Sequence, residues 1–532
     1  MSIAAPALPR PSIWARLANG IVRGLRREPR EAGKRAPAYV AAGPSRSRDD
    51  WTLSNAGPNT VGAASRAALT ARARDLIRND PHCARIVSVQ VQNIVGTGIL
   101  ATAKHDGTPE GKARAKMADW IWSEACKAGV LDNSGQLTGD GLQVSECRAW
   151  VGDGDVFIRR VVDLTARPVP MRLQVLEADM LDERQNGQVL PSGNRIVQGV
   201  EVNPSGRRVA YWFLTAHPGE TYALGGFGPS VRVDASDVIH LMRPLRPGQV
   251  RGITELAPIM AQKKDLGDFE QFTLTAKKTE ALLVGVITRQ PYDEWNPRPE
   301  IPYADEGEED EPSVLVPGVI NSDGDLVGDM RPGAFLAVEH GTDIKFNQPQ
   351  IASNYDVFKK THLQSCAVGT NLSYEQLSGD FSAANYSTMR GGMLEFWRHI
   401  DTMIWVYFVP AQNRVWQWVM ESAWLAGLID TPSVDAEWQP PKRQSIEPDK
   451  DAIADYLELR AGWVDEDDLI AARGYNPTAL REKTAKNKAE RDARNIVVDT
   501  DPTKMSWRGA APATVASTPL ADLAPDAAKV QP

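Results

Sequence analysis

Apolar residues recur at helical spacing from about residue 386 onward. A polar stretch, Leu377–Ser387, precedes them and is rich in the Ser, Asp, Asn and Gly that form turns and helix caps. Pro410 predicts the end of the helix, and Gly391 with Gly392 predicts a kink or a close backbone approach inside it. The spacing of three or four residues defines one face, made of Met389, Met393, Phe396, Ile400, Ile404 and Phe408. A polar loop that leads into a long helix, far from either terminus, indicates a functional element. The alternative is an ordinary surface loop before a core helix.

Further helices are predicted near the start of the chain. Two occupy residues 65–95, and Asp80-Pro81 supplies the second with an N-cap and a proline at its first position. A third spans residues 109–128, with three residues facing inward: Met117, Trp120 and Ile121.

The pattern changes to strands after Val151. Five segments alternate or run apolar: Asp155–Val162, Met171–Leu176, Ile196–Val202, Val209–Leu214 and Val238–Met242. Asn203-Pro-Ser-Gly206 is a hairpin-type turn between two of them. A mixed, mostly antiparallel sheet with helices is expected, which is an α+β fold.

Two helices flank a small β-rich segment further along. Thr254 is expected to cap a helix that runs to Leu283, and a second helix is expected at Asn354–Val368. Between them lie an acidic run at residues 305–311 and three predicted strands: Leu282–Ile287, Ser313–Ile320 and Ala334–Val338. After the stretch that begins at Leu377 we expect an aromatic-rich helix with Trp405, Tyr407, Trp416, Trp418 and Trp424.

The two ends of the chain have biased compositions. Residues 1–50 are basic and carry a helical apolar stripe, so they either dock on a partner protein, a membrane or nucleic acid, or form a flexible arm. Residues 446–491 predict two or three charged helices. Residues 492–532 are rich in Ala, Pro and Thr, which predicts disorder.

Composition bounds the kind of protein. The 532 residues predict three or four domains or subdomains, and 42% hydrophobic with 24% charged residues is typical of globular proteins. A net charge of −8 argues against binding nucleic acid by bulk charge. The four cysteines are widely spaced, which predicts reduced thiols, and we expect neither a membrane span nor a secretory signal.

No constellation typical of an enzyme emerges from the motifs. A phosphate-binding loop and a nucleophile elbow are both absent, and the seven histidines show no ligand spacing. His240 lies inside a predicted strand and is expected to be a core or interface residue rather than a base. Gly152–Gly154 predicts a turn in which Asp153 and Asp155 act as caps. We therefore expect no catalytic residues, no metal and no cofactor, and a structural or binding function.

Several segments, in one order over about residues 65 to 480, resemble the lambda-type bacteriophage portal proteins. They are Leu76–Ile86, Asn93–Ile99, Gly152–Ile158, Leu173–Asp179, Ala235–Leu241, Arg246–Ile253, Ser378–Ser387, Glu395–Arg398, Ile446–Lys450 and Ala472–Gly474. The acidic insert near residue 305 lies outside this resemblance.

The resemblance implies a ring, typically of twelve subunits, at one capsid vertex of a phage or prophage. Double-stranded DNA enters and leaves through its central channel. The family has no enzymatic activity, and ATP hydrolysis belongs to the terminase. Implied partners are the terminase large subunit, the major capsid and scaffold proteins, and head-completion or adaptor proteins. The implied location is the virion, after assembly in the host cytoplasm.

The family architecture of wing, stem, clip and crown implies a division of this chain. The expected parts are a basic arm at 1–50, an α+β wing at 51–252, stem helices at 253–283 and 350–370, a β-rich clip at 284–349, a channel loop with a long wing helix at 371–445, a helical crown at 446–491 and a disordered tail at 492–532.

Candidate DNA-facing residues follow from that division. In the loop they are Asp380, Ser382 and Asn385, whose polar side chains can contact DNA without binding it tightly. On the first stem helix they are Lys263, Lys264, Lys277 and Lys278, whose alternative role is ordinary solvated or subunit-interface charge. A net acidic subunit suits a channel that must not hold DNA tightly.

Two other functions stay open from the residues. One is a metal-dependent DNA-processing enzyme using Asp323, Asp325 and the acidic run, although Asp323-Gly-Asp325 lacks the glutamate that completes a calcium loop. The other is a monomeric adaptor or head-completion protein.

Overall fold

The structure is a computed structural model. It describes residues 55–220, 228–288, 315–317, 319–320, 326–327, 334–338, 355–382, 384–443, 447–496 and 498. The chain divides into two units after Gly57, and every element below belongs to the second, Pro58–Pro532. The apolar stripe of the arm, the acidic run, Asp323 with Asp325, and the predicted disorder beyond residue 498 lie outside the described residues.

Four helices build the first part of the fold: α2 (Pro58–Asn79), α3 (Pro81–Ile94), α4 (Pro109–Ala125) and α5 (Gly139–Asp153). The predicted cap is confirmed, because Asp80 accepts a hydrogen bond from the Cys83 N–H and Pro81 opens α3. In α4, Ile121 is fully buried as expected. Met117 and Trp120 are 43% and 49% exposed, so their predicted inward position was wrong.

Helix α5 was not predicted. It ends at Gly154, which adopts a left-handed conformation (φ 96°) where an added Cβ would meet the Ile253 backbone at 2.2 Å. Gly152 therefore lies in a helix rather than a turn. Gln143 and Glu146 are buried in α5 although both are polar, which obscures its hydrophobic pattern.

Two antiparallel sheets follow, which confirms the α+β class. The first has β2 (Asp155–Val162) between β3 (Met171–Glu177) and β8 (Val238–Met242), with Ile158 paired to Val175 and to Ile239. The second runs in the order β4 (Arg195–Val197), β5 (Val200–Val202), β6 (Arg208–Phe213) and β7 (Val231–Asp234). The strand predicted at Ile196–Val202 is thus two strands joined by a tight turn at Gln198-Gly199. A short pair, β1 (Leu100–Ala103) with β14 (Ala436–Gln439), joins distant parts of the chain.

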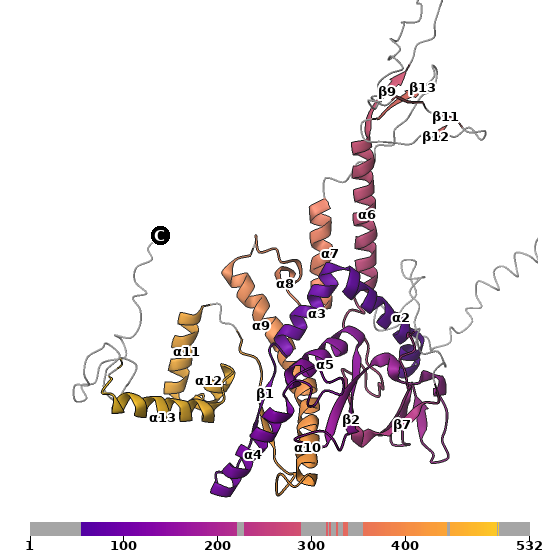
Figure 1. Cartoon of the computed structure of the whole chain (residues 1–532). Helices are drawn as coiled ribbons and strands as arrows, with labels where there is room; N and C mark the ends of the chain where they lie inside the picture. The colour runs from indigo at the N-terminus through magenta and orange to yellow at the C-terminus, as the bar shows by residue number, and fades with distance from the viewer. Residues whose placement is uncertain are drawn as a thin grey trace, which may run out of the picture. The chain divides into compact units, whose positions relative to one another are not determined.

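Helices α6 (Met260–Leu282) and α7 (Tyr355–Gly369) lie side by side (Figure 1). Helix α6 begins at Met260 and not at Thr254, because residues 255–259 form turns around Pro258. Between the two helices, β13 (Ala334–Val338) pairs in parallel with β9 (Leu283–Thr288) and β10 (Leu315–Pro317), and β11 (Val319–Ile320) pairs with β12 (Leu326–Val327).

One long helical run follows α8 (Tyr374–Ser378). It consists of α9 (Tyr386–Thr402), a π-helical segment η6 (Met403–Phe408) and α10 (Val409–Leu425). Pro410 therefore does not stop the helix, and that prediction was wrong. The Val409 N–H bonds to the Ile404 carbonyl, five residues back, so the wider π turn absorbs the proline. Helix α9 continues through Gly391 and Gly392, and the irregular segment lies further on.

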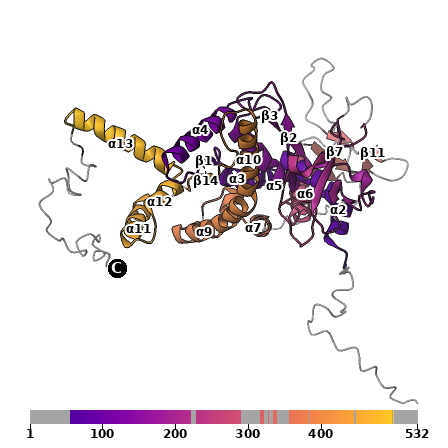
Figure 2. The same ribbon diagram turned by 90° about the horizontal axis from the view of Figure 1, so that it is seen from below.

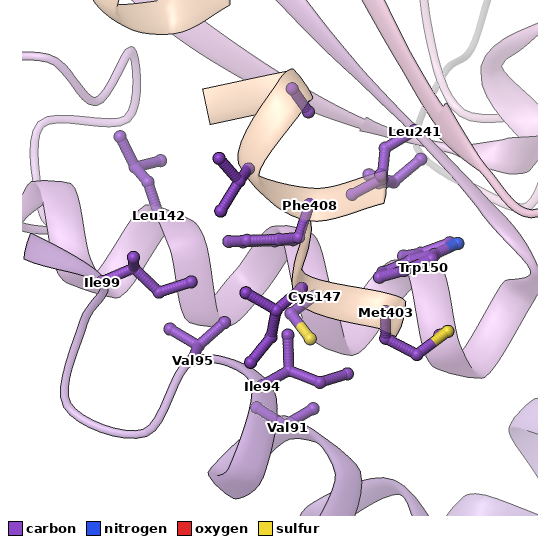
Figure 3. Close-up of a cluster of buried hydrophobic side chains, with 14 of the residues drawn as sticks. Val91, Ile94, Val95, Ile99, Leu142, Cys147, Trp150, Leu241, Met403 and Phe408 are labelled. Carbon is purple, nitrogen blue, oxygen red and sulfur yellow. The ribbon is translucent and has the colours of Figure 1, made fainter. Parts of the chain in front are cut away.

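The π-helical segment lies in the core. Figure 3 shows Met403 and Phe408 projecting among side chains of α3 and α5, beside Leu241 of β8. Phe408 and Trp150 are fully buried, with ring centroids 6.5 Å apart. This core fixes the base of α9 and α10 against the first sheet.

The C-terminal helices are α11 (Pro448–Ala461), α12 (Glu466–Ala472) and α13 (Pro477–Ala493), drawn in yellow tones in Figure 1 and Figure 2. None of the three contains a buried residue. Among the described helices, none has the length and apolar character needed to cross a membrane.

Candidate channel loop and helix pair

The loop between α8 and α9 is built from local caps. Ser373 and Gln376 form a capping box at the start of α8, and Gly379 ends it with φ 72°. Asp380 Oδ1 then accepts the Ser382 N–H at 3.0 Å. Asn385 caps α9 by accepting the Thr388 N–H at 2.9 Å. The short polar residues of the sequence motif therefore shape the loop itself.

The same residues give the loop an exposed polar surface. Asp380, Ser382 and Asn385 are all exposed. Hydrogen bonds from the Ser382 side chain and N–H lower the pKa of Asp380, so its carboxylate stays charged at neutral pH. Two aromatic residues that we did not predict also lie here: Phe381 is 53% exposed and Tyr386 is 37% exposed. Both residues belong to the Leu377–Ser387 stretch, and that position was the sequence signal that could have identified them.

Helices α6 and α7 are joined by rings and charges. Phe269 of α6 lies 4.4 Å from Phe358 and 5.9 Å from Tyr355 of α7, between ring centroids. Lys359 Nζ lies 2.8 Å from Glu270 Oε1. The pair is therefore a unit rather than two independent arms.

The four candidate lysines of α6 differ in their surroundings. Lys263 is 3% exposed and its Nζ lies 2.9 Å from Asp80 Oδ2, so its ammonium does not face solvent. Burial alone would raise the pKa of Asp80, but hydrogen bonds from Lys263 and the Cys83 N–H hold it below its ordinary value. Lys264 is exposed and bonds to Asp268 at 2.6 Å. Lys277 and Lys278 are exposed. We leave Lys263 out of any DNA-facing surface.

A buried charge cluster anchors the segment that leads into α6. Arg251 Nε donates to Asp155 Oδ2 at 2.6 Å, and the Gly252 N–H reaches the same oxygen at 3.1 Å. Burial would raise the pKa of Asp155, but Arg251 and His240 hold it well below its usual range. Asp153 pairs with Arg74 at 2.6 Å. The predicted cap role of these two aspartates was therefore wrong, and only the fold brings their arginines to them.

His240 is a core residue, as predicted. Its ring lies 4.3 Å from Phe157, and its Nε2 is 3.2 Å from Asp155 Oδ2. Burial lowers the pKa of His240 to about 4, so the ring is neutral at physiological pH.

One cluster in the described part of the chain has metal-ligand chemistry: Glu177, Asp179 and His217. Arg74 already occupies it, with Nη2 2.9 Å from Glu177 Oε2 and Nη1 2.6 Å from Asp179 Oδ2. A guanidinium between the two carboxylates opposes a cation there. We assign no metal to it.

Comparison with known families decides the class of protein. The model of the lambda family of phage portal proteins matches residues 44–403. The chain belongs to this family. Membership favours the portal function over the metal-dependent enzyme, and it gives the chain a structural rather than enzymatic role.

Named relatives agree. A probable portal protein of Halomonas phage phiHAP-1 is 24% identical over 462 residues, which cover 82% of this chain and 84% of that protein. Portal protein B of Escherichia phage lambda is 22% identical over 62% of this chain and 63% of its own length. The portal protein of Escherichia phage N15 is 24% identical over 62% and 64%.

Among solved structures, a chain from the neck of a native gene transfer agent particle aligns with 78% of this chain and 99% of its own. The identity is 14% and the TM-score is 0.37. A chain from the neck of an empty particle aligns with 80% and 100%, at 15% identity and a TM-score of 0.37.

Proposed function

We propose that this portal-family chain assembles into a ring of identical copies, twelve in number, at one capsid vertex. Double-stranded DNA is packaged and ejected through the centre of the ring. Family membership over residues 44–403 is the observation that carries this function. Two features of the isolated subunit support assembly.

The first feature is the apolar surface of the α6–α7 pair. Four large side chains are more than half exposed although the pair has its own ring contacts: Phe272 (72%), Leu274 (55%), Val357 (66%) and Val368 (79%). Large apolar side chains are typical of the buried part of subunit interfaces. Neighbouring copies in a ring would cover it.

The second feature is the lack of any buried residue in α11–α13. Helix α11 still carries exposed Ile453 and Leu457, and Trp463, in the connection between α11 and α12, is 81% exposed. Exposed ion pairs such as Arg473–Asp455 contribute only about 0.2–1 kcal/mol each, which is too little to order three helices. Contacts between copies would supply the missing burial.

Within the ring, residues 51–252 would form the wing, and residues 253–283 with 350–370 would form the stem. Residues 284–349 would form the clip, and residues 446–491 the crown. The loop from Leu377 to Tyr386 would then face the channel, at the end of the long wing helix. The ion pair between Lys263 and Asp80 would fix the stem to the wing.

The charges suit a channel that guides DNA without holding it. Each copy has a net charge of −8, to which the ionised Asp380 of the loop contributes. Lys264, Lys277 and Lys278 offer local positive charge to the phosphate backbone. Every phosphate–lysine pair adds salt-dependent affinity, so few of them are expected.

The partners follow from that position. Terminase large subunit and head-completion or adaptor proteins would dock on the ring, and major capsid and scaffold proteins would surround it. Residues 1–50, which are basic, are our candidate for the scaffold or capsid contact. The protein would assemble in the host cytoplasm and remain in the virion.

Light scattering on the purified chain tests the assembly. One copy has a mass of 58.2 kDa, and a ring has several hundred kilodaltons. A monomer at all concentrations would instead favour an adaptor or head-completion protein.

A further inference from the structure

A cleft of about 830 Å³ lies where the β5–β6 hairpin, the short helix η5 (Ala235–Asp237), the loop at 245–251 and α10 meet. Its lining includes Arg207, Arg208, Arg414 and a single acidic residue, Asp234. An adjoining hollow of about 530 Å³ shares Arg208 and adds Arg246. Neither includes a residue of the candidate channel loop or of α6.

The three arginines of this cleft have no carboxylate partner in the part of the chain that the structure describes. Arg208 donates to the Val250 carbonyl at 3.2 Å, and Arg414 donates to the Ser236 carbonyl at 3.3 Å. Arg207 is exposed. By contrast, the buried Arg251 and the half-buried Arg160 are both matched to carboxylates. The cleft thus holds guanidinium groups whose ion-pairing capacity is unused.

The walls of the cleft are held in place. Gln249 accepts the Leu245 N–H at 2.9 Å and donates to the Arg251 carbonyl at 2.8 Å, which closes the loop. Asn59 of α2 clamps the same loop by accepting the Val250 N–H at 2.8 Å. Arg414 lies 5.7 Å from the Trp418 ring centroid. A site whose donors are already positioned loses less entropy when it binds.

We propose that this cleft binds an acidic segment of a partner polypeptide. Guanidinium groups take carboxylates in a bidentate fork, so Arg207 and Arg414 would hold Asp or Glu side chains. The apolar part of the lining, which includes Val202, Val209 and Tyr211, would take the neighbouring side chains of the segment.

A peptide fits the cleft better than nucleic acid does. A duplex presents a continuous row of phosphates, one charge per about 1.7 Å of axis, and so has no uncharged donor to place against Asp234 in the wall. The apolar part of the lining cannot form hydrogen bonds or ion pairs with a phosphate backbone. A peptide, in contrast, alternates carboxylates with apolar side chains and can offer Asp234 a backbone N–H.

The test uses the full-length assembled chain and a fluorescent peptide of alternating Glu and Leu, with a Gln–Leu peptide for comparison. We expect anisotropy to report binding of the Glu peptide only. Arg207→Gln should weaken it several-fold, and Arg207→Gln with Arg414→Gln at least tenfold. Arg398→Gln, which alters an exposed arginine of α9, should bind like the wild type. Because Arg207 is exposed, its single variant tests the cleft even if changing Arg414 disturbs folding.

Four outcomes would overturn the proposal. Equal binding of the Glu and Gln peptides would show that the cleft does not recognise carboxylates. Unchanged peptide affinity in Arg207→Gln, with reduced binding of a short DNA duplex, would assign the arginines to nucleic acid. Loss of the ring in the variants would make the cleft a contact between copies. An intact wild-type ring that fails to bind the peptide refutes this site while leaving the portal function standing.

Discussion

Lys263 of α6 reaches out of its helix to Asp80, the N-cap residue of α3, and the two charged atoms lie 2.9 Å apart. The Asp80 carboxylate therefore both pairs with Lys263 and caps α3, because it also accepts a hydrogen bond from the Cys83 N–H. The lysine side chain is 2% exposed and that of Asp80 is 20% exposed. One ion pair thus couples the start of the α6–α7 pair to the helices near the N-terminal end of the fold.

Lys263→Met should destabilise the subunit by about 3 kcal/mol, because it leaves a largely buried carboxylate without its cation. Lys264→Met is the matched control, since its exposed pair with Asp268 contributes at most about 1 kcal/mol. Urea unfolding of both variants measures the difference. Equal, small effects would show that the buried pair does not anchor α6.

The same pair predicts an acid-sensitive contact. The pKa of Asp80 is lowered in the folded state, so its contribution to stability is present above its unfolded value of 3.8. That contribution is lost as the pH falls below 3.8 through the folded pKa. The stability difference between wild type and Asp80→Asn should therefore shrink over that range in thermal unfolding. A difference that is independent of pH would contradict the assignment.

Glu146 predicts a pH effect of opposite sign. It is fully buried in α5 and accepts a hydrogen bond from Gln412 Nε2 at 2.7 Å, and burial raises the pKa of its carboxyl from 4.5 to about 8. The folded state keeps a proton that the unfolded state releases, so stability is highest below pH 4.5 and falls as the pH rises through 8. Glu146→Gln should match the wild type at pH 4.5 and exceed it by a few kcal/mol at pH 9.

The control for that experiment is Glu124→Gln, which alters a partly exposed carboxylate paired with Lys127. Its stability relative to the wild type should change little between pH 4.5 and 9. A flat difference for Glu146→Gln as well would show that this carboxyl does not hold its proton in the folded protein.

Local signals allowed many of the elements to be predicted. Asp80-Pro81 marks a helix start through local capping chemistry, and β2 was predicted with its observed bounds because β-branched and aromatic residues dominate its sequence. Helix α5 was missed because Gln143 and Glu146 are polar yet buried, with partners that only the fold supplies. The prediction of a helix end at Pro410 was wrong because the core around Phe408 stabilises a π turn that accommodates the proline.

The candidate site was predicted less completely. The loop residues Asp380, Ser382 and Asn385 were identified through turn chemistry, which is local. Lys263 could not be separated from Lys264 by sequence, since only the position of Asp80 distinguishes them. The arginine cleft combines a hairpin, a loop and α10, so no local motif indicates it.

Deleting residues 380 to 384 tests the channel loop. Ring assembly should survive, because Asp380 and Ser382 are exposed and outside the core. Packaging of DNA, or its retention in filled heads, should fail. Heads of this variant that fill and stay full would show that the loop does not contact DNA.

The lysines near the end of α6 are tested by charge reversal. Lys277→Glu with Lys278→Glu should leave rings intact but alter the retention of DNA in packaged heads, since both side chains are exposed. Lys104→Glu with Lys112→Glu, which alters two exposed lysines outside α6, is the control with the same change of net charge. Unchanged DNA retention in the double variant would show that these lysines do not contact DNA in the channel.

The most direct test of the portal function is the symmetry of the purified assembly. Class averages from electron microscopy should show a closed ring, with twelve-fold rotational symmetry and a central hole wide enough for duplex DNA. Discrete monomers, or assemblies without rotational symmetry and without a hole, would contradict it.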